Sequence, residues 1–216
     1  MNAAATSALL LCTAEPAVPA PDGAAAVSAA NLRDAAVAAL QRQFGCDLAQ
    51  ARRVREVALA LHRDAAPDAG LEEYRELAWA CALHELGRCI SHHDHHRHGA
   101  YLVEHADAAG FTAAQQRRLA DLVLAQRGGL KKLEAALARR PFARQVLCLR
   151  LAAIRCHARR DVAGPRLRLQ TLGGRRHALR WERASPPADP RTLHLLQEEV
   201  ALWAQQGPLE LLLQAP

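Results

Sequence analysis

The sequence is poor in aromatic residues and in lysine. Aromatic residues are 4% of its 216 residues, so few rings are available to stack on bases, and no recognised nucleic-acid-binding motif occurs. Its only lysines are Lys131 and Lys132, whereas 26 arginines supply the rest of the positive charge. Nucleic acid is therefore not the expected partner.

Long apolar runs and closely paired cysteines are also missing. Three consecutive leucines at 9–11 are far too few to cross a bilayer, and no basic residues precede them, so we expect no membrane span, no signal peptide and a cytoplasmic location. The six cysteines include no Cys-x-x-Cys pair. Most lie in apolar helical patterns, which predicts reduced thiols that pack as small hydrophobes.

Positive charge is concentrated in one segment. The formal net charge is +6, but residues 139–183 contain thirteen arginines and only two acids, Asp161 and Glu182. This segment carries +11 and the remainder −5, a distribution that attracts polyanions such as polyphosphate or phosphorylated nucleotides. A general preference for arginine over lysine would explain the residue type but not the scarcity of acids.

Hydrophobic periodicity predicts a mainly α fold with a small C-terminal α/β appendage. Residues 1–30, rich in Ala and Pro, are expected to form a disordered tail. Residues 31–163 form the predicted helical domain, and residues 164–216 form the appendage. Asp47 with Gln50 resembles a capping box at the start of one expected helix, and Thr112 with Gln115 caps another. The expected helices, placed by 3.6-residue periodicity, caps and breakers, cover 31–45, 47–66, 71–86, 97–110, 112–125, 130–138 and 141–160.

The appendage is predicted from a change of period. Residues 167–172 alternate apolar and polar side chains, Gly173 and Gly174 supply a two-residue turn, and 177–181 pair back as a hairpin. Pro190 opens a last helix. Residues 209–213 are a candidate edge strand beside the hairpin.

The most distinctive segment is 84–102, which contains six histidines. Neutral imidazole binds zinc, manganese or iron and carries protons near neutral pH. The stretch 83–87, Leu-His-Glu-Leu-Gly, resembles the Leu-His-Asp-Ile-Gly signature of HD-type metal phosphohydrolases. That resemblance implies an HD-like helical bundle with His84, Glu85 and His95 as candidate ligands of Mn, Fe, Zn or Mg.

A wider resemblance covers about residues 31–213. The segments 90–93, 96–102, 110–120 and 148–152, the helix 47–61, the hairpin and the Trp203 helix are similar to the C-terminal helical domain of the exopolyphosphatase/guanosine pentaphosphate phosphatase family. This wider resemblance implies an HD-like accessory domain that stands alone, without the family's actin-like catalytic domains. Such a domain is expected to hold polyphosphate and to form a homodimer. A separately encoded actin-like phosphatase is an alternative partner.

The HD resemblance also identifies what is missing. Gln50 and Gln126 stand where ligand histidines are expected, and Ala153 stands where the closing Asp is expected. Because a catalytic metal needs about three protein ligands, we expect no cofactor and a chain that is not catalytic alone. The alternatives are an HD-type phosphohydrolase using His84, Glu85 and His95, and a hydrogen-bonded His84–Glu85 pair that only ends a helix.

Two sets of residues are predicted to bind the polyanion. At 100° per residue, Arg144, Arg155 and Arg159 fall on one polar stripe of the expected 141–160 helix, and guanidinium groups offer paired donors to phosphate. A solvated helix face is the alternative. The second set, from the histidine-rich loop, is also open to interpretation as an ordinary surface loop: His92, His93, His96, Arg97 and His98.

Overall fold

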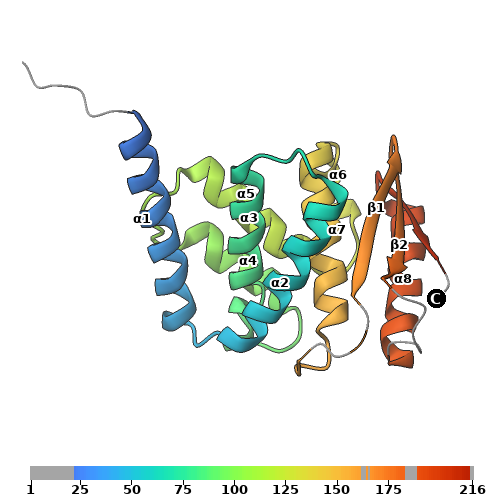
Figure 1. Cartoon of the computed structure of the whole chain (residues 1–216). Coiled ribbons are helices and arrows are strands. Elements are labelled where there is room, and N and C mark those ends of the chain that lie inside the picture. Colours follow the sequence, from blue (N-terminus) through green and yellow to red (C-terminus); the bar gives the residue numbers. More distant parts are fainter. Residues whose placement is uncertain (1–21, 162–163, 165, 183–188, 215–216) are drawn as a thin grey trace, which may run out of the picture.

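The computed structural model describes residues 22–161, 164, 166–182 and 189–214, with side chains from residue 31 onward. Within this part of the chain the fold is mainly helical, with a small C-terminal sheet, as predicted (Figure 1). The helices are α1 (Asp22–Gln43), α2 (Leu48–Ala65), α3 (Leu71–Leu83), η1 (Leu86–Cys89), α4 (His95–His105), α5 (Ala113–Ala125), η2 (Lys131–Leu133), α6 (Glu134–Leu137), α7 (Arg140–Arg155) and α8 (Pro190–Gln206). The strands are β1 (Leu167–Gly173), β2 (Arg176–Trp181) and β3 (Glu210–Leu213).

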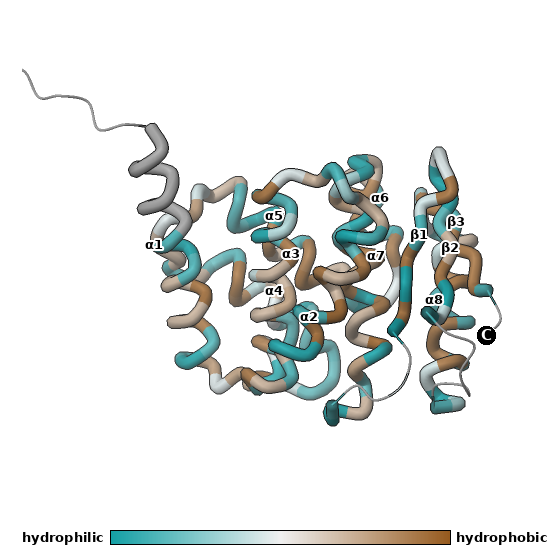
Figure 2. Tube along the Cα trace, viewed as in Figure 1, coloured by the Kyte–Doolittle hydropathy of each residue, from teal (hydrophilic) through white to brown (hydrophobic). Residues whose placement is uncertain are grey.

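The helices α1 to α7 form a bundle in which α3 and α7 supply much of the core. Leu77, Ala80 and Leu83 of α3 are fully buried, and so are Phe142 and Leu147 of α7. Hydrophobic and hydrophilic segments alternate along the helices (Figure 2), as expected for elements with one buried face. No helix in the described residues is long and apolar enough to cross a membrane.

The appendage is a three-stranded sheet with one covering helix. Strands β1 and β2 pair antiparallel, and β3 adds in parallel to β2, which confirms the predicted edge strand. Helix α8 is the crossover between β2 and β3 that a parallel pair requires, and it contacts both β3 and α7. Strand β1 lies against α2, where the Thr171 hydroxyl donates to the Ala65 carbonyl (2.7 Å).

Several predicted boundaries are wrong, most of all at the start of α1. Helix α1 begins at Asp22 rather than near Asn31, while residues 1–21 of the predicted tail lie outside the described residues. Helix α3 ends at Leu83, before the tighter turn of η1. The hairpin turn is Gly174-Arg175 rather than Gly173-Gly174, because a bulge between Thr171 and Gly173 shifts the register by one residue.

The cap predictions are confirmed at α5 and half confirmed at α2. Thr112 and Gln115 form a complete capping box. Asp47 accepts from the Gln50 amide (2.9 Å), but the Gln50 side chain turns into the bundle instead of back to the cap.

Gly87 brings η1 into backbone contact with α4: an added Cβ would lie 2.1 Å from the His95 carbonyl oxygen and 2.3 Å from the Gly99 nitrogen.

Candidate functional site

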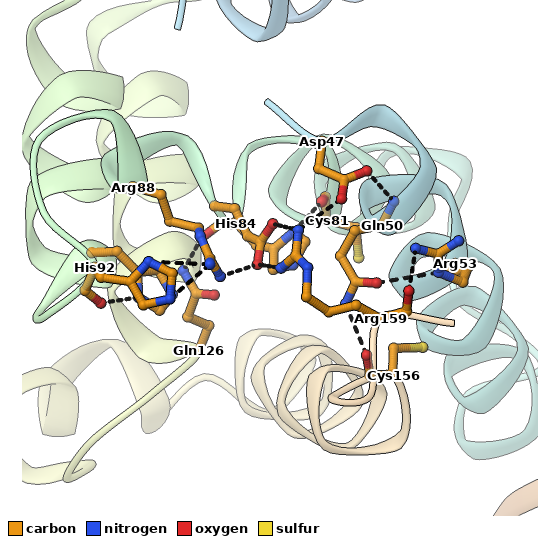
Figure 3. Close-up of polar contacts among 12 residues, drawn as sticks. Asp47, Gln50, Arg53, Cys81, His84, Arg88, His92, Gln126, Cys156 and Arg159 are labelled. Atoms are coloured by element: carbon orange, nitrogen blue, oxygen red, sulfur yellow. Dashed lines mark hydrogen bonds and ion pairs between the residues drawn. The ribbon is translucent and has the colours of Figure 1, made fainter. Parts of the chain in front are cut away.

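The Glu85 carboxylate, one of the predicted metal ligands, is bound by two arginines. Arg159 donates from Nη1 to Glu85 Oε1 (2.5 Å), and Arg88 donates from Nη1 to the same oxygen (2.7 Å). Arg159 also contacts Asp47 Oδ2 through Nη2 (2.7 Å), so one guanidinium joins the end of α3, the N-terminus of α2 and the chain beyond α7 (Figure 3). Burial alone raises the pKa of Glu85, but the hydrogen bond from Arg159 and the surrounding positive charges outweigh it and hold this pKa below its ordinary value.

The two predicted histidine ligands are buried and held by backbone carbonyls. His84 Nδ1 lies 2.7 Å from the Cys81 oxygen, and His95 Nδ1 lies 3.3 Å from the His92 oxygen. Burial lowers the pKa of both rings, so we assign His84 as a neutral ring with its proton on Nδ1. In the described part of the chain, no three His, Cys, Asp or Glu side chains are arranged to hold a metal ion. Metal binding by His84, Glu85 and His95 stays a prediction.

The two glutamines at expected ligand positions act as hydrogen-bonding links. Gln50 is 3% exposed, and its Nε2 donates to the Cys156 carbonyl (2.9 Å) while its Oε1 accepts from Arg53 Nε (3.2 Å). Gln126 is 7% exposed, and its Nε2 donates to the His84 carbonyl (2.6 Å). The amides therefore connect α2 to the end of α7, and α5 to the residue after α3.

The predicted arginine stripe does not form as one helical face. Helix α7 ends at Arg155, and Arg159 lies beyond it with φ of +55°, a left-handed conformation from which it reaches Asp47 and Glu85. Arg144 Nη2 lies 4.0 Å from a Glu73 oxygen, and the Arg155 guanidinium lies 5.6 Å from the ring centre of Trp181. The predicted helical position of Arg159 is wrong because α7 ends four residues before it. Polyanion binding by the three arginines stays a prediction.

The histidine-rich loop divides between two places. The His92 ring faces Arg88, with Nε2 2.8 Å from Nη2, and so belongs to the Glu85 network. His93 is exposed, whereas His98 is half-buried and lies against the Gly87 backbone. His96 and Arg97 line a separate pocket.

This pocket, termed here the basic pocket, has a volume of about 460 Å³. It lies between the start of α4, the loop joining α5 to η2 and the end of α8. Its lining residues are Asp94, His96, Arg97, Arg127, Gly128, Gly129, Lys131, Lys132 and Gln206.

Positive charge exceeds negative charge in the basic pocket. Arg97 lies 4.0 Å from Asp94, whereas Arg127, Lys131 and Lys132 have no carboxylate partner within 4.0 Å among the described residues. Partial burial and the neighbouring Arg150 and Arg97 charges lower the pKa of Lys132 to about 8. Burial and the Lys132 charge lower the pKa of His96 to about 4. A bound anion would relieve the repulsion that contributes to both shifts.

The loop that carries these cations is held in place by the buried ion pair between Arg150 and Glu199. Arg150 Nη1 donates to the carbonyls of Ala125 (2.8 Å) and Gly128 (3.1 Å), while its Nε and Nη2 contact Glu199 of α8 at 2.5 and 2.8 Å. Gln206, also of α8, accepts from the Leu130 amide (2.9 Å). The basic pocket is thus shaped by the bundle and the appendage together.

Sequence reasoning missed five polar residues of this pocket: Asp94, Arg127, Lys131, Lys132 and Gln206. A local signal was present, because the only two lysines of the chain follow Arg127, Gly128 and Gly129 and lie within five residues of Arg127. Gly128 has φ of +75°, which explains a glycine at that point of the loop. Nothing local connects Gln206 to this segment, since it lies more than seventy residues later.

The fold and the two sites define a mainly helical module with a basic pocket, in which the Glu85 carboxylate is paired with Arg88 and Arg159. The family model described as Ppx/GppA phosphatase, domain III, matches residues 32–189. The chain therefore belongs to the Ppx/GppA phosphatase family, through its domain III. The match confirms the resemblance seen in the sequence, and it includes every lining residue of the basic pocket except Gln206.

Proposed function

We propose that this chain is an exopolyphosphatase-related module that binds a phosphate-rich polyanion, polyphosphate or a phosphorylated nucleotide, without hydrolysing it. The basic pocket is the observation that carries the proposal. Arg97, Arg127, Lys131 and Lys132 surround a space of about 460 Å³, and arginine and lysine are the side chains that pair with phosphate oxygens. Membership of the Ppx/GppA family supports the same ligand class.

The non-catalytic part of the proposal is supported by the side chains around Glu85. Gln50 and Gln126 use their amide groups to bind backbone carbonyls, and Glu85 is already paired with Arg88 and Arg159. Metal analysis of the purified protein, with polyphosphate hydrolysis assayed in parallel, tests this part. If the protein contains stoichiometric Mn, Fe or Zn, and the His84→Ala variant loses both this metal and phosphate release, the chain is a metal phosphohydrolase instead.

Binding itself is tested by calorimetric titration with polyphosphate at several salt concentrations. We expect an affinity that falls steeply as salt rises, because each cation–phosphate contact releases counterions. The double variant Arg127→Ala/Lys131→Ala should lose most of this affinity. Arg42→Ala/Arg63→Ala removes the same charge from exposed positions on α1 and α2 and should bind as the unmodified protein does. Equal loss in both variants would mean that only net charge matters and would contradict the pocket.

A further inference from the structure

The basic pocket has a limited extent, and this sets the size of what it can hold. Its volume of about 460 Å³ lies within the range of about 300 to 1,000 Å³ that is typical of small-molecule sites. The lining comes from three short segments, at the start of α4, between α5 and η2 and at the end of α8. Together they surround one space.

The arginines that could extend this space into a longer track are used elsewhere. Arg159 is paired with Glu85 and Asp47, and Arg150 is 5% exposed and bound to Glu199. Arg144 has an 18% exposed side chain beside Glu73. None of these three arginines lines the basic pocket, so they do not extend it into a longer track.

The charge of the pocket matches a short group of phosphates. Four cations, Arg97, Arg127, Lys131 and Lys132, face one carboxylate, Asp94, which leaves an excess of three positive charges. A terminal phosphate carries about −1.5 to −2 at neutral pH, so two or three linked phosphoryl groups supply the compensating charge. His96 is 5% exposed and, in the described part of the chain, its Nδ1 has no hydrogen-bond partner.

We propose, as an extension that depends on the polyanion-binding function above, that the basic pocket recognises a cluster of two or three linked phosphoryl groups. These groups are carried by a free oligophosphate or by a nucleoside. A long polyphosphate chain then binds through one such cluster at a time and not along an extended surface. The lining contains no Phe, Tyr or Trp, so a nucleoside would add few contacts of its own.

The test is a calorimetric series with orthophosphate, diphosphate, tripolyphosphate and long-chain polyphosphate, each measured at several salt concentrations. Tripolyphosphate should bind at least about tenfold more tightly than orthophosphate, because each added charge-assisted contact contributes about that factor. Beyond three phosphates, the affinity per binding position and the salt slope should stay constant. The Arg127→Ala/Lys131→Ala variant should abolish the gain between orthophosphate and tripolyphosphate, and Arg42→Ala/Arg63→Ala should preserve it.

The outcomes separate this extension from the function on which it depends. A salt slope that keeps increasing with chain length would overturn the cluster model and leave polyanion binding intact. Failure of every phosphate compound to bind would overturn both. A nucleoside triphosphate included in the series distinguishes the two sources: tighter binding than tripolyphosphate assigns the cluster to a nucleotide, and equal binding assigns it to a free oligophosphate. Either result supports recognition of the cluster.

Discussion

Arg159 shows how a single side chain redefines the Glu85 site. Its guanidinium contacts Glu85 and Asp47, and these contacts hold together segments separated by more than seventy residues. The Arg159 guanidinium thereby places a positive charge beside Glu85, the carboxylate that the HD resemblance assigns to a metal. Unlike a metal ion, a guanidinium has no open coordination position for a water molecule, which fits a structural tie better than hydrolysis.

Replacing Arg159 by Ala should lower the free energy of unfolding by about 1 to 2 kcal/mol at pH 7, a value reduced for solvent screening because the side chain is 37% exposed. The loss should depend on pH. Since the folded pKa of Glu85 is depressed, its stabilising contribution is present above the unfolded pKa and is lost as the pH falls through the folded value. Urea unfolding between pH 7 and pH 3 measures it. The exposed neighbour Arg160→Ala is the control, and an equal loss there would refute the tie.

Lys132 is a case in which binding and stability oppose each other. Its pKa is lowered to about 8 by partial burial and by Arg150 and Arg97. Keeping it charged therefore costs stability below pH 8, and this cost disappears as the pH rises from about 8 towards the unfolded value. Lys132→Met should accordingly raise the melting temperature at pH 7 while weakening phosphate binding, with the stability gain fading by about pH 10. Lys131→Met, which removes the neighbouring charge of the same pocket, should weaken binding without that gain. A Lys132→Met protein that melts lower at pH 7 would contradict the assignment.

At the scale of elements, the periodicity and the caps located nearly every helix. Thr112 and Gln115 gave the start of α5 to the residue, and Pro190 gave the start of α8. The C-terminal ends of the helices were harder to predict, because the turn after Leu83 and the turn after Arg155 depend on distant partners. His84 is held through its carbonyl by Gln126, and Arg159 by Glu85. Local patterns contain no information on such contacts.

Gly87→Ala is expected to separate η1 from α4. The new Cβ would meet backbone atoms of His95 and Gly99 at 2.1 and 2.3 Å, and backbone cannot move aside as a flexible side chain can. We expect a loss of about 3 kcal/mol or more, or failure to fold. Gly70→Ala is the matched control, because nothing lies within 4 Å of a Cβ there. Thermal unfolding of both variants measures the difference, and similar melting temperatures would show that the two elements are not in close contact.

For the whole molecule, the candidate site could be predicted only in part. His96 and Arg97 were identified because they lie in an unusual segment, and both line the basic pocket. The other cations became part of a site only when the loop after α5 was placed against α4 and α8. That arrangement depends on Arg150 and Glu199, which are far apart in the sequence and are 5% exposed each. Sequence patterns report which residues are buried or polar, but not which distant segments meet.

The Arg150–Glu199 pair should therefore link stability to binding across the molecule. Glu199 also accepts from the Trp203 indole (2.6 Å), so Glu199→Gln leaves a buried guanidinium without its counter-charge and weakens the hold of α8 on α7. Removing one partner of a buried pair costs about 3 to 5 kcal/mol. Because Arg150 also donates to the carbonyls of Ala125 and Gly128, the same variant should weaken tripolyphosphate binding, although Glu199 does not line the pocket.

The control for this prediction is Glu198→Gln, which removes the same charge from an exposed position whose carboxylate lies 3.4 Å from His194 Nε2. It should change neither urea unfolding nor phosphate titration by more than a small amount. A Glu199→Gln protein that is destabilised but still folded, and that binds tripolyphosphate with unchanged affinity, would show that the loop keeps its shape without α8. The appendage would then contribute to stability alone, and the basic pocket would belong to the bundle.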